Sequence, residues 1–390
     1  MTAVIDRADS LGTPDRPLGQ PQYVCMTAVT DSNDRRAYDH CKPVLPMPAN
    51  YRVRRHTLSA IPSKKEPPPA QTSLLDTLRG WLKIRELNIL SVLILVGILI
   101  SFFSPYFLTT DNLMGVFRSF SLIAIMSIGM MLVIITGGID LSVGSVMGLS
   151  SLMTALAFQQ GWGAFPAVLC GLGVGVAVGA FNGFLITRIE LPPFIATLGT
   201  LSIGRGLMYI ITKGVPVTPD IPDSFAYIGQ GYIGLVPFPV VIMIVMTVCF
   251  AILMRRTRFG RHVYATGGNE VAARLSGVRT NRVKFIVYTL SGLIASLAGI
   301  ISFSRFVSAE PASGFGAELD VIAAAAIGGA SLSGGAGSVE GAIIGAALAG
   351  IISNGVVLLN INTYAQQAIT GCVILIAVSI DIWRIRRKGR

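Results

Sequence analysis

The feature that most constrains this chain is a succession of long apolar segments, which begins at Ile89 and continues almost to the C-terminus. Most helix-length windows in this region contain no charge, and only 13% of the chain is charged, against roughly 25% in soluble domains. About 20 apolar residues suffice to cross a bilayer as an α-helix. The alternation typical of barrel strands is absent from these segments. The sequence therefore predicts an all-α polytopic membrane protein.

About ten transmembrane helices are expected, six within 89–254 and four within 284–383. A polar, basic stretch at 255–283 separates the two groups. The sequence leaves open whether the eighth segment crosses the membrane or re-enters it. The expected ranges are 89–107, 113–136, 141–158, 164–187, 193–212, 237–254, 284–304, 317–333, 338–357 and 365–383.

The N-terminal part differs in composition from the rest. Residues 1–70 hold 10 of the 20 prolines and show no helical or strand periodicity, so we expect a disordered, proline-rich tail. Residues 75–88, with Trp81 among basic side chains, are typical of an interfacial cytoplasmic segment before the first span.

Basic residues set the expected orientation, because Lys and Arg accumulate in cytoplasmic loops. One set of connections carries nearly all of the basic charge, and the alternate loops carry only Lys213 and Arg305. Both termini are therefore predicted to be cytoplasmic, with 384–390 as a basic C-terminal end, and the net charge of +11 indicates topology rather than nucleic-acid binding. The basic set comprises Arg79–Arg85, Arg188, Arg255–Lys284 and Arg384–Arg390.

Glycine-rich stretches such as "GLGVGVAVGAFNG" and "GAIIGAALAG" indicate closely packed helices. "GGIDLSVG" from Gly137 and "GGASLSGG" from Gly328 also share a pattern, and an Asn-Gly pair follows each, at Asn182 and at Asn354. Two duplicated halves, with a pathway including Asn182 at their interface, would explain this echo. Chance similarity in glycine-rich sequence is the alternative.

Asp140 is the strongest candidate for a pathway residue. It lies in "TGGIDLSVG", where two glycines interrupt the helix and Ser142 adds a polar group, as expected of irregular backbone that lines a cavity. The alternative is that Asp140 caps the N-terminus of the third span by accepting backbone N–H bonds. Both remain open.

Other charged residues also lie inside predicted spans, where an ionised side chain is costly and normally faces the protein interior or water. Arg118 and Glu340 lie near span ends and are expected to extend to the membrane interface. For Arg205, we expect an internal ion pair with Glu318 or Asp320 rather than a contact with substrate. These three residues are retained as candidates for the pathway.

"ELPPFIATLGT" from Glu190 predicts a helix that begins at the proline pair. Phe194, Thr197 and Thr200 follow at spacings of three and so share one early face. An aromatic ring with hydroxyls suits passage of a polar, partly apolar molecule. The alternative is that each threonine bonds to its own helix and that Phe194 only packs.

No catalytic or metal motif is recognisable. "LSGG" at Leu332 matches the opening of an ATPase signature, but no G-x-x-x-x-G-K-[ST] phosphate loop exists. The three histidines are scattered, and no cysteines pair at metal spacing. We therefore expect neither an enzyme nor a cofactor.

The basic stretch contains a predicted short helix, Glu270–Ser276. Asn269 is a good N-cap, Glu270 suits the positive helix end, and Gly277 can end the helix in a left-handed conformation, while Gly267 and Gly268 are expected to break the chain beforehand. Its apolar face, formed by Val271, Ala272 and Leu275, stands in the cytosol and is typical of a surface that docks into another protein.

These segments resemble a known family. "GRHVYATGGNEVAARLSGV" is similar to the cytoplasmic coupling loop of ribose-type sugar permeases, the membrane subunits of ATP-binding-cassette (ABC) importers. "TGGIDLSVGSVMGL", "NGFLITRIELPPFIATLGT" and "AIGGASLSGGAGSVEGAIIGA" resemble other segments of that family, over about 75–390.

The resemblance implies a homodimeric, multi-pass permease of the bacterial inner membrane that imports a monosaccharide, with a pentose such as ribose or xylose favoured. A separate cytoplasmic ATPase would grip the coupling loop, and an extracytoplasmic sugar-binding protein would deliver the substrate. ATP binding would then change access to the pathway. The implied coupling residues are Gly260, Arg261, Gly267, Asn269, Glu270, Val271, Ala272, Leu275, Ser276 and Gly277.

Two other functions compete with this one. An ion-driven secondary transporter would also have about ten spans, and Asp140, Glu318 and Asp320 could relay protons, but the docking helix would have no purpose. A membrane scaffold would explain the glycine-rich packing but not the polar groups at depth.

Overall fold

The computed structural model describes residues 85–362, with residues 368, 371–372 and 379. The predicted tail 1–70, the interfacial residues 75–84 and the basic end 384–390 lie outside the described residues, as does almost all of the predicted last span, 365–383. Residues 85–88, expected at the interface, already belong to the first helix.

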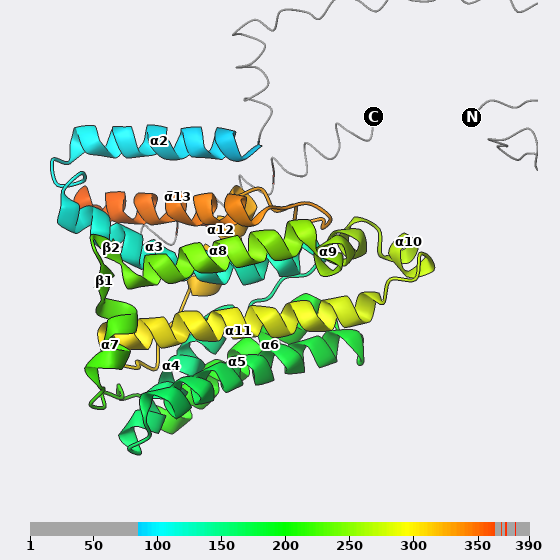
Figure 1. Cartoon of the computed structure of the whole chain (residues 1–390), viewed down its shortest axis with the longest axis horizontal. Helices are drawn as coiled ribbons and strands as arrows, with labels where there is room; N and C mark the ends of the chain where they lie inside the picture. The colour runs from blue at the N-terminus through cyan, green and yellow to red at the C-terminus, as the bar shows by residue number, and fades with distance from the viewer. Residues whose placement is uncertain (1–84, 363–367, 369–370, 373–378, 380–390) are drawn as a thin grey trace, which may run out of the picture. The chain divides into compact units, whose positions relative to one another are not determined.

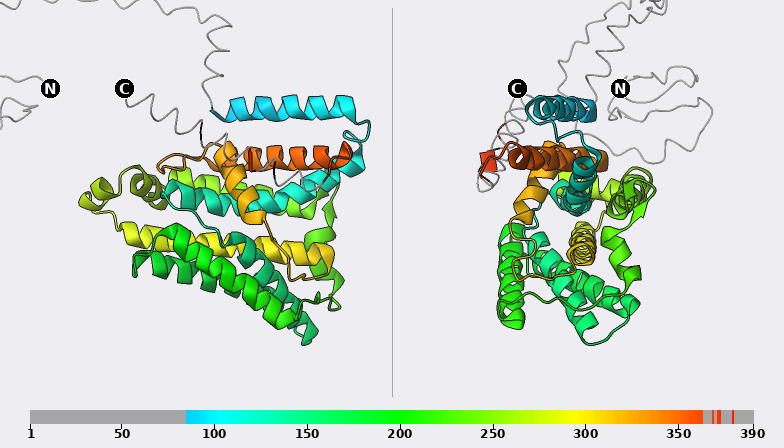
Figure 2. Two further views of the ribbon diagram at one scale, coloured as in Figure 1. Left: turned by 180° about the vertical axis from the view of Figure 1, so that it is seen from behind. Right: turned by 90° about the vertical axis from the view of Figure 1, so that its left-hand side faces the viewer.

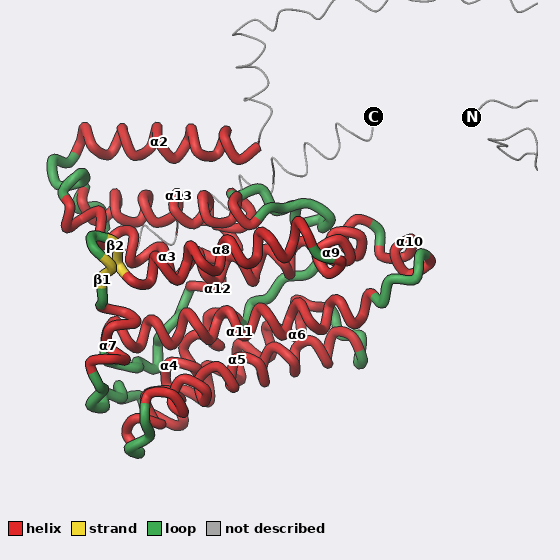
Figure 3. The backbone as a smooth tube through the Cα atoms, viewed as in Figure 1, coloured by secondary structure: helices red, strands yellow, loops and turns green. Residues whose placement is uncertain are grey.

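Long helices run side by side through the described part of the chain (Figure 1). A two-stranded antiparallel hairpin pairs Tyr232 with Pro237 (Figure 3). The helices are α2 (Arg85–Phe103), α3 (Thr110–Ile135), α4 (Val143–Gln159), α5 (Ala164–Thr187), α6 (Pro193–Thr212), α7 (Asp223–Gln230), α8 (Phe238–Arg256), α9 (Arg258–Gly268), α10 (Glu270–Leu275), α11 (Thr280–Phe306), α12 (Ala317–Ile327) and α13 (Val339–Leu358), and the strands are β1 (Tyr232–Ile233) and β2 (Val236–Pro237).

The prediction of a polytopic all-α membrane protein is confirmed. Among the described residues, six helices are long and apolar enough to cross a bilayer: α3, α5, α6, α8, α11 and α13. The range predicted for α5 and that predicted for α6 agree with the structure at both ends. Apolar side chains on the outer faces, such as Phe165 and Ile210, are exposed and suit contact with lipid.

Helices α3 and α11 form the centre of the bundle. α11 packs against α5, α4 and α3, and α13 packs against α3, α12 and α2. Small residues allow the closest of these contacts. A Cβ on Gly175 of α5 would overlap the carbonyl oxygen of Gly292 on α11, and a Cβ on Gly179 would overlap that of Tyr288. The close packing predicted from the glycine pattern is therefore confirmed for this pair.

The eighth predicted segment, 317–333, is a partial helix. α12 ends at Ile327, and Gly329 continues with a positive φ of 93°. Its 11 residues extend about 16 Å, half of the roughly 30 Å hydrocarbon core. The prediction of one helix over 317–333 is therefore wrong beyond Ile327, because the glycine pair Gly328–Gly329 favours a turn.

The segment between α11 and α13 nevertheless passes from one end of the bundle to the other. α11 ends beside α7, where Ser304 Oγ donates to the carbonyl of Phe225 (2.6 Å). α13 begins beside α9, where Tyr264 Oη donates to the carbonyl of Gly337 (2.7 Å). In Figures 1 and 2 the hairpin and α7 lie at one end, and α9 and α10 lie at the other.

Candidate functional site

Residues 257–278, here called the coupling segment, project from one end of the bundle as two consecutive helices, α9 and α10. The predicted short helix is confirmed, with Ser276 as its C-cap. Asn269 is the N-cap, and its Oδ1 accepts the backbone N–H of Ala272 (2.9 Å). Gly277 follows in the left-handed region with φ of 85°. Local capping chemistry therefore determines both ends of this helix.

The apolar face of α10 is uncovered. Val271 and Leu275 are 70% and 84% exposed, and Ala272 is also exposed. Ala273, on the opposite side, is buried and anchors the helix. Two large aliphatic side chains in water on a six-residue helix form a surface suited to docking into another protein.

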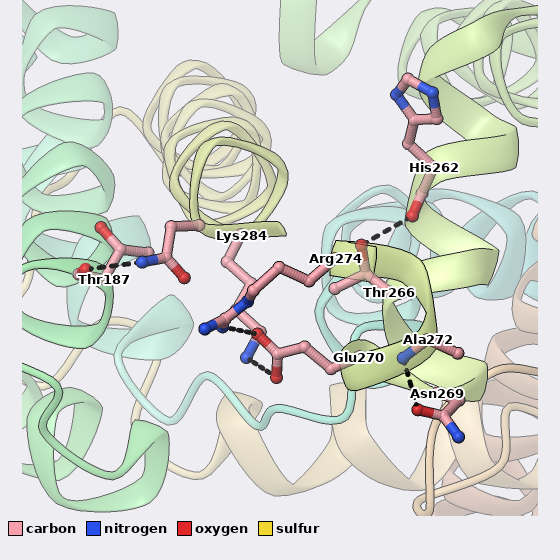
Figure 4. A network of polar contacts seen from close by, with 9 residues as sticks. Thr187, His262, Thr266, Asn269, Glu270, Ala272, Arg274 and Lys284 are labelled. Atoms are coloured by element: carbon pink, nitrogen blue, oxygen red, sulfur yellow. Dashed lines mark hydrogen bonds and ion pairs between the residues drawn. The ribbon is translucent and has the colours of Figure 1, made fainter. Parts of the chain in front are cut away.

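An ionic network ties α10 to the start of α11 (Figure 4). Lys284 Nζ donates to Glu270 Oε2 at 2.7 Å, and Arg274 donates to Glu270 Oε1 at 3.3 Å. Partial burial alone would raise the pKa of Glu270, but the hydrogen bond and charge of Lys284, with the charge of Arg274, hold it below its ordinary value of 4.5. The network therefore joins α10 to the start of α11.

Gly267 joins the coupling segment to the membrane helices. The expectation that Gly267 and Gly268 break the chain is wrong, because both lie in the last turn of α9 and the break occurs at Asn269. Gly267 is instead required because α9 lies very close to the end of α3 at this point. An added Cβ there would overlap the carbonyl oxygen of Ile135, the last residue of α3, which accepts the N–H of Gly335 (2.9 Å).

The implied coupling residues at the start of α9 differ in exposure. Gly260 is buried, and a Cβ there would overlap the carbonyl oxygen of Met254 on α8. Arg261 is exposed. Gly260 therefore permits the tight turn between α8 and α9, whereas Arg261 presents its charge at the surface.

A buried polar cluster surrounds Asp140, which is 1% exposed. Its Oδ1 accepts the backbone N–H and the hydroxyl of Ser142 (3.0 and 2.6 Å), and its Oδ2 accepts the hydroxyl of Ser291 on α11 (2.8 Å). Asn182 Nδ2 on α5 donates to Ser142 Oγ (2.9 Å). The cluster thus links the break before α4 to two other helices.

Asp140 is neither the N-cap of α4 nor a surface of an open pathway in this conformation. α4 begins at Val143 with Ser142 as its N-cap residue, so Asp140 lies too far upstream, and Ser142 supplies the one backbone N–H that its carboxylate accepts among the described residues. Asn182 Oδ1 and Tyr288 Oη are buried near this cluster without a hydrogen-bond partner. Unpaired buried groups of this kind are costly.

The structure separates the three residues that the sequence predicts on one face of α6. Thr197 and Thr200 are buried and donate to carbonyls of their own helix, at Pro193 (2.8 Å) and Thr197 (3.0 Å). Phe194 is exposed on the outer side. The alternative that the threonines bond within their helix is confirmed. Three residues advance a helix by about 300° rather than by a full turn. Phe194 is therefore rotated away from Thr197, and further away from Thr200.

The predicted internal ion pair of Arg205 is confirmed for Glu318, at 3.6 Å. Arg205 also donates to the carbonyls of Ser313 (2.7 Å) and Gly314 (2.5 Å), in the non-helical stretch before α12. The guanidinium therefore satisfies backbone groups that no helix pairs. Asp320 lies elsewhere, on the wall of a cavity.

This cavity has a volume of about 460 Å³ and lies between α3, α12 and α13. Of the predicted pathway residues, Asp320 alone lines it. Sequence reasoning missed its other polar residues, since most lie near helix ends, where polar side chains are ordinary. They are Asp111, Asn112, Ser119, Arg305, Ser353 and Asn354.

Comparison with known proteins identifies the family. Residues 112–378 match the family model described as "Branched-chain amino acid transport system / permease component". The chain belongs to this permease family. No solved structure matches the permease.

Curated relatives are similar over most of the permease. Ribose import permease protein RbsC of Escherichia coli K12 is 42% identical over 306 residues, which cover 78% of this chain and 95% of the relative. RbsC of Bacillus subtilis 168 is 42% identical over 290 residues (74% and 90%). Xylose transport system permease protein XylH of Haemophilus influenzae is 33% identical over 368 residues (77% and 97%).

These findings confirm the family expected from the sequence. The permease is a multi-pass inner-membrane subunit of the ABC importer class, and a transport component rather than an enzyme. Membership in this class implies a separate ATPase and a solute-binding protein as partners. The ion-driven transporter is not favoured.

Proposed function

We propose that this permease imports a monosaccharide, with ribose and xylose as the first substrates to test. The identity to ribose and xylose permeases over at least nine-tenths of each relative's length supports this substrate class. The pathway would carry an uncharged solute, whose selection rests with the binding protein. ATP would be hydrolysed by a partner subunit.

The single observation that carries the coupling role is the uncovered apolar face of α10 on a helix ionically tied to α11. When the two ATPase subunits close on ATP, the captured helix would move with them. Its displacement would reach α11 through Glu270 and Lys284, and α3 through Gly267 and Ile135. Both α3 and α11 lead to the Asp140 cluster, which is our proposed element of the access change.

We further propose a homodimer of ten-helix subunits, with residues 365–383 as the tenth span and both termini cytoplasmic. The basic charge of Arg255–Lys284 supports a cytoplasmic position for the coupling segment. The proposed organisation keeps the tail at 1–70, the interfacial segment at 75–88, spans at 89–254 and 284–383, the coupling loop at 255–283 and the basic end at 384–390.

The proposed pathway residues now fall into three groups. Asp140, Ser142, Asn182, Thr197, Thr200, Arg205 and Glu318 would shape the interior through hydrogen bonds and the Arg205–Glu318 ion pair, and Asp320 would face the transported solute. The exposed position of Phe194 suits lipid or a neighbouring subunit. The coupling group, Gly260 to Gly277, would transmit motion.

A substitution at Leu275 tests the coupling role. Leu275→Glu places a charge on the docking face, whereas Leu275→Met keeps it apolar. In cells that contain the partner ATPase and binding protein, we expect Leu275→Glu to abolish ribose or xylose uptake and capture of the ATPase, with normal membrane insertion. Leu275→Met should behave as the unaltered chain. Uptake by Leu275→Glu at the normal rate would refute the docking role.

A further inference from the structure

The cavity between α3, α12 and α13 lies mostly in the half of the bundle away from the coupling segment. Its lining includes the first turn of α3, with Asp111 and Asn112, and Arg305 in the last turn of α11. Asn354 and Val357 contribute from the end of α13. With the coupling segment in the cytosol, these positions place the cavity in the outer half of the membrane.

Two amides pair with each other on the wall of this cavity. Asn112 Nδ2 donates to Asn354 Oδ1 (3.1 Å), and Asn354 Nδ2 donates to Asn112 Oδ1 (2.8 Å). Asn112 Nδ2 also donates to the carbonyl of Phe107 (2.9 Å). The pair therefore connects α3 to α13, and each amide supplies both a donor and an acceptor.

Charged and apolar groups complete the wall. Nη1 and Nη2 of Arg305 both donate to Ser119 Oγ at 3.3 Å, and Asp320 lies on the same wall. Phe120 and Ala323 are among the apolar residues of the lining. Hydrogen-bonding groups around an apolar floor match a molecule with hydroxyls on a carbon ring.

We propose that this cavity is a transit site for an uncharged monosaccharide on its way from the binding protein to the membrane interior. The inference rests on the proposed function and adds where the sugar sits. The volume of about 460 Å³ falls within the range of roughly 300–1,000 Å³ of small-molecule sites.

The amide pair explains why such a site would hold its sugar weakly. Two adjacent sugar hydroxyls that enter between Asn112 and Asn354 can donate to the two amide oxygens and accept from the two amide nitrogens, so they replace the existing hydrogen bonds and little free energy is gained. A weak site releases its occupant onward. Two carboxylates and one guanidinium on the lining, from Asp111, Asp320 and Arg305, would disfavour anionic sugar phosphates.

A cysteine at Ser353 tests the site without disturbing the fold, because the replacement is nearly isosteric. The full importer carrying Ser353→Cys is treated from outside with a membrane-impermeant methanethiosulfonate bearing a sulfonate. We expect modification to reduce ribose or xylose uptake at least tenfold, and excess sugar with binding protein to slow the modification. Ser224→Cys is the control, because Ser224 is exposed in α7, beside the end of α11 and outside the cavity lining, and treatment should leave its uptake unchanged.

Removal of the amide pair provides a second measurement. We expect the double variant Asn112→Ala/Asn354→Ala to show about tenfold lower uptake, while capture of the ATPase and of the binding protein stays normal. Unchanged uptake in this variant, or in modified Ser353→Cys, overturns the transit site while the proposed function stands. If the unaltered importer moves neither ribose nor xylose, it is the proposed substrate class that fails.

Discussion

Replacement of Gly267 by alanine should damage the permease, whereas the same change at its neighbour Gly268 should be harmless. Both glycines lie in the last turn of α9. At Gly267 an added Cβ would overlap the carbonyl oxygen of Ile135 and approach Gly335 N at 2.7 Å, while at Gly268 it would meet nothing within 4 Å. The two variants therefore differ only in what the new methyl group contacts.

The magnitude follows from these contacts. Alanine gains a similar helix propensity at both positions, up to about 1 kcal/mol, so this contribution cancels between the variants. At Gly267 the added methyl costs about 1–3 kcal/mol in overpacking. The added methyl group would also contact both Ile135 O and Gly335 N, so the hydrogen bond between them should break, at a cost of about 1 kcal/mol. Gly267→Ala should thus be less stable than Gly268→Ala by about 2–4 kcal/mol.

Thermal unfolding of the two purified variants in detergent measures this difference. We expect the midpoint of Gly267→Ala to lie roughly 4–8 °C below that of Gly268→Ala. Sugar uptake per inserted molecule should also fall in Gly267→Ala, since α9 no longer contacts the end of α3. Equal midpoints and equal uptake would refute the assignment of Gly267 as the joint.

Two further predictions concern Asp140 and Glu270. Asp140→Ala leaves the donors of Ser142 and Ser291 without their acceptor, at about 1–3 kcal/mol for each buried group. The unfolding midpoint of Asp140→Ala in detergent should therefore lie below that of Asp140→Asn, which keeps one oxygen. Equal midpoints would contradict the hydrogen-bonded cluster. Because the pKa of Glu270 is lowered from 4.5, its ionic network should stabilise α10 fully above pH 4.5 and weaken as the pH falls below that value. A spin label at Ser276→Cys should keep constant mobility from pH 8 to pH 5 and become more mobile below 4.5, whereas a change between pH 8 and pH 6 would contradict this sign.

Much of the coupling segment could be predicted because its determinants are local. The amide of Asn269, the charge of Glu270 and the missing side chain of Gly277 act within a few residues of themselves, so their spacing alone defines both ends of α10. The spans were predictable for the same reason, since a bilayer requires each long apolar segment to pair its own backbone groups.

The sequence by itself determined that the chain lies in a bilayer, that its secondary structure is helical and that a short capped helix with an apolar face follows Asn269, because hydropathy and capping depend on near neighbours. Only the tertiary structure decided that Gly267 fits against Ile135, that Asp140 bonds to Ser291 and that Asn112 pairs with Asn354. The partners in the last two pairs are 151 and 242 residues apart in sequence. Such contacts depend on how helices cross, which follows from the sum of many small packing interactions rather than from any local pattern.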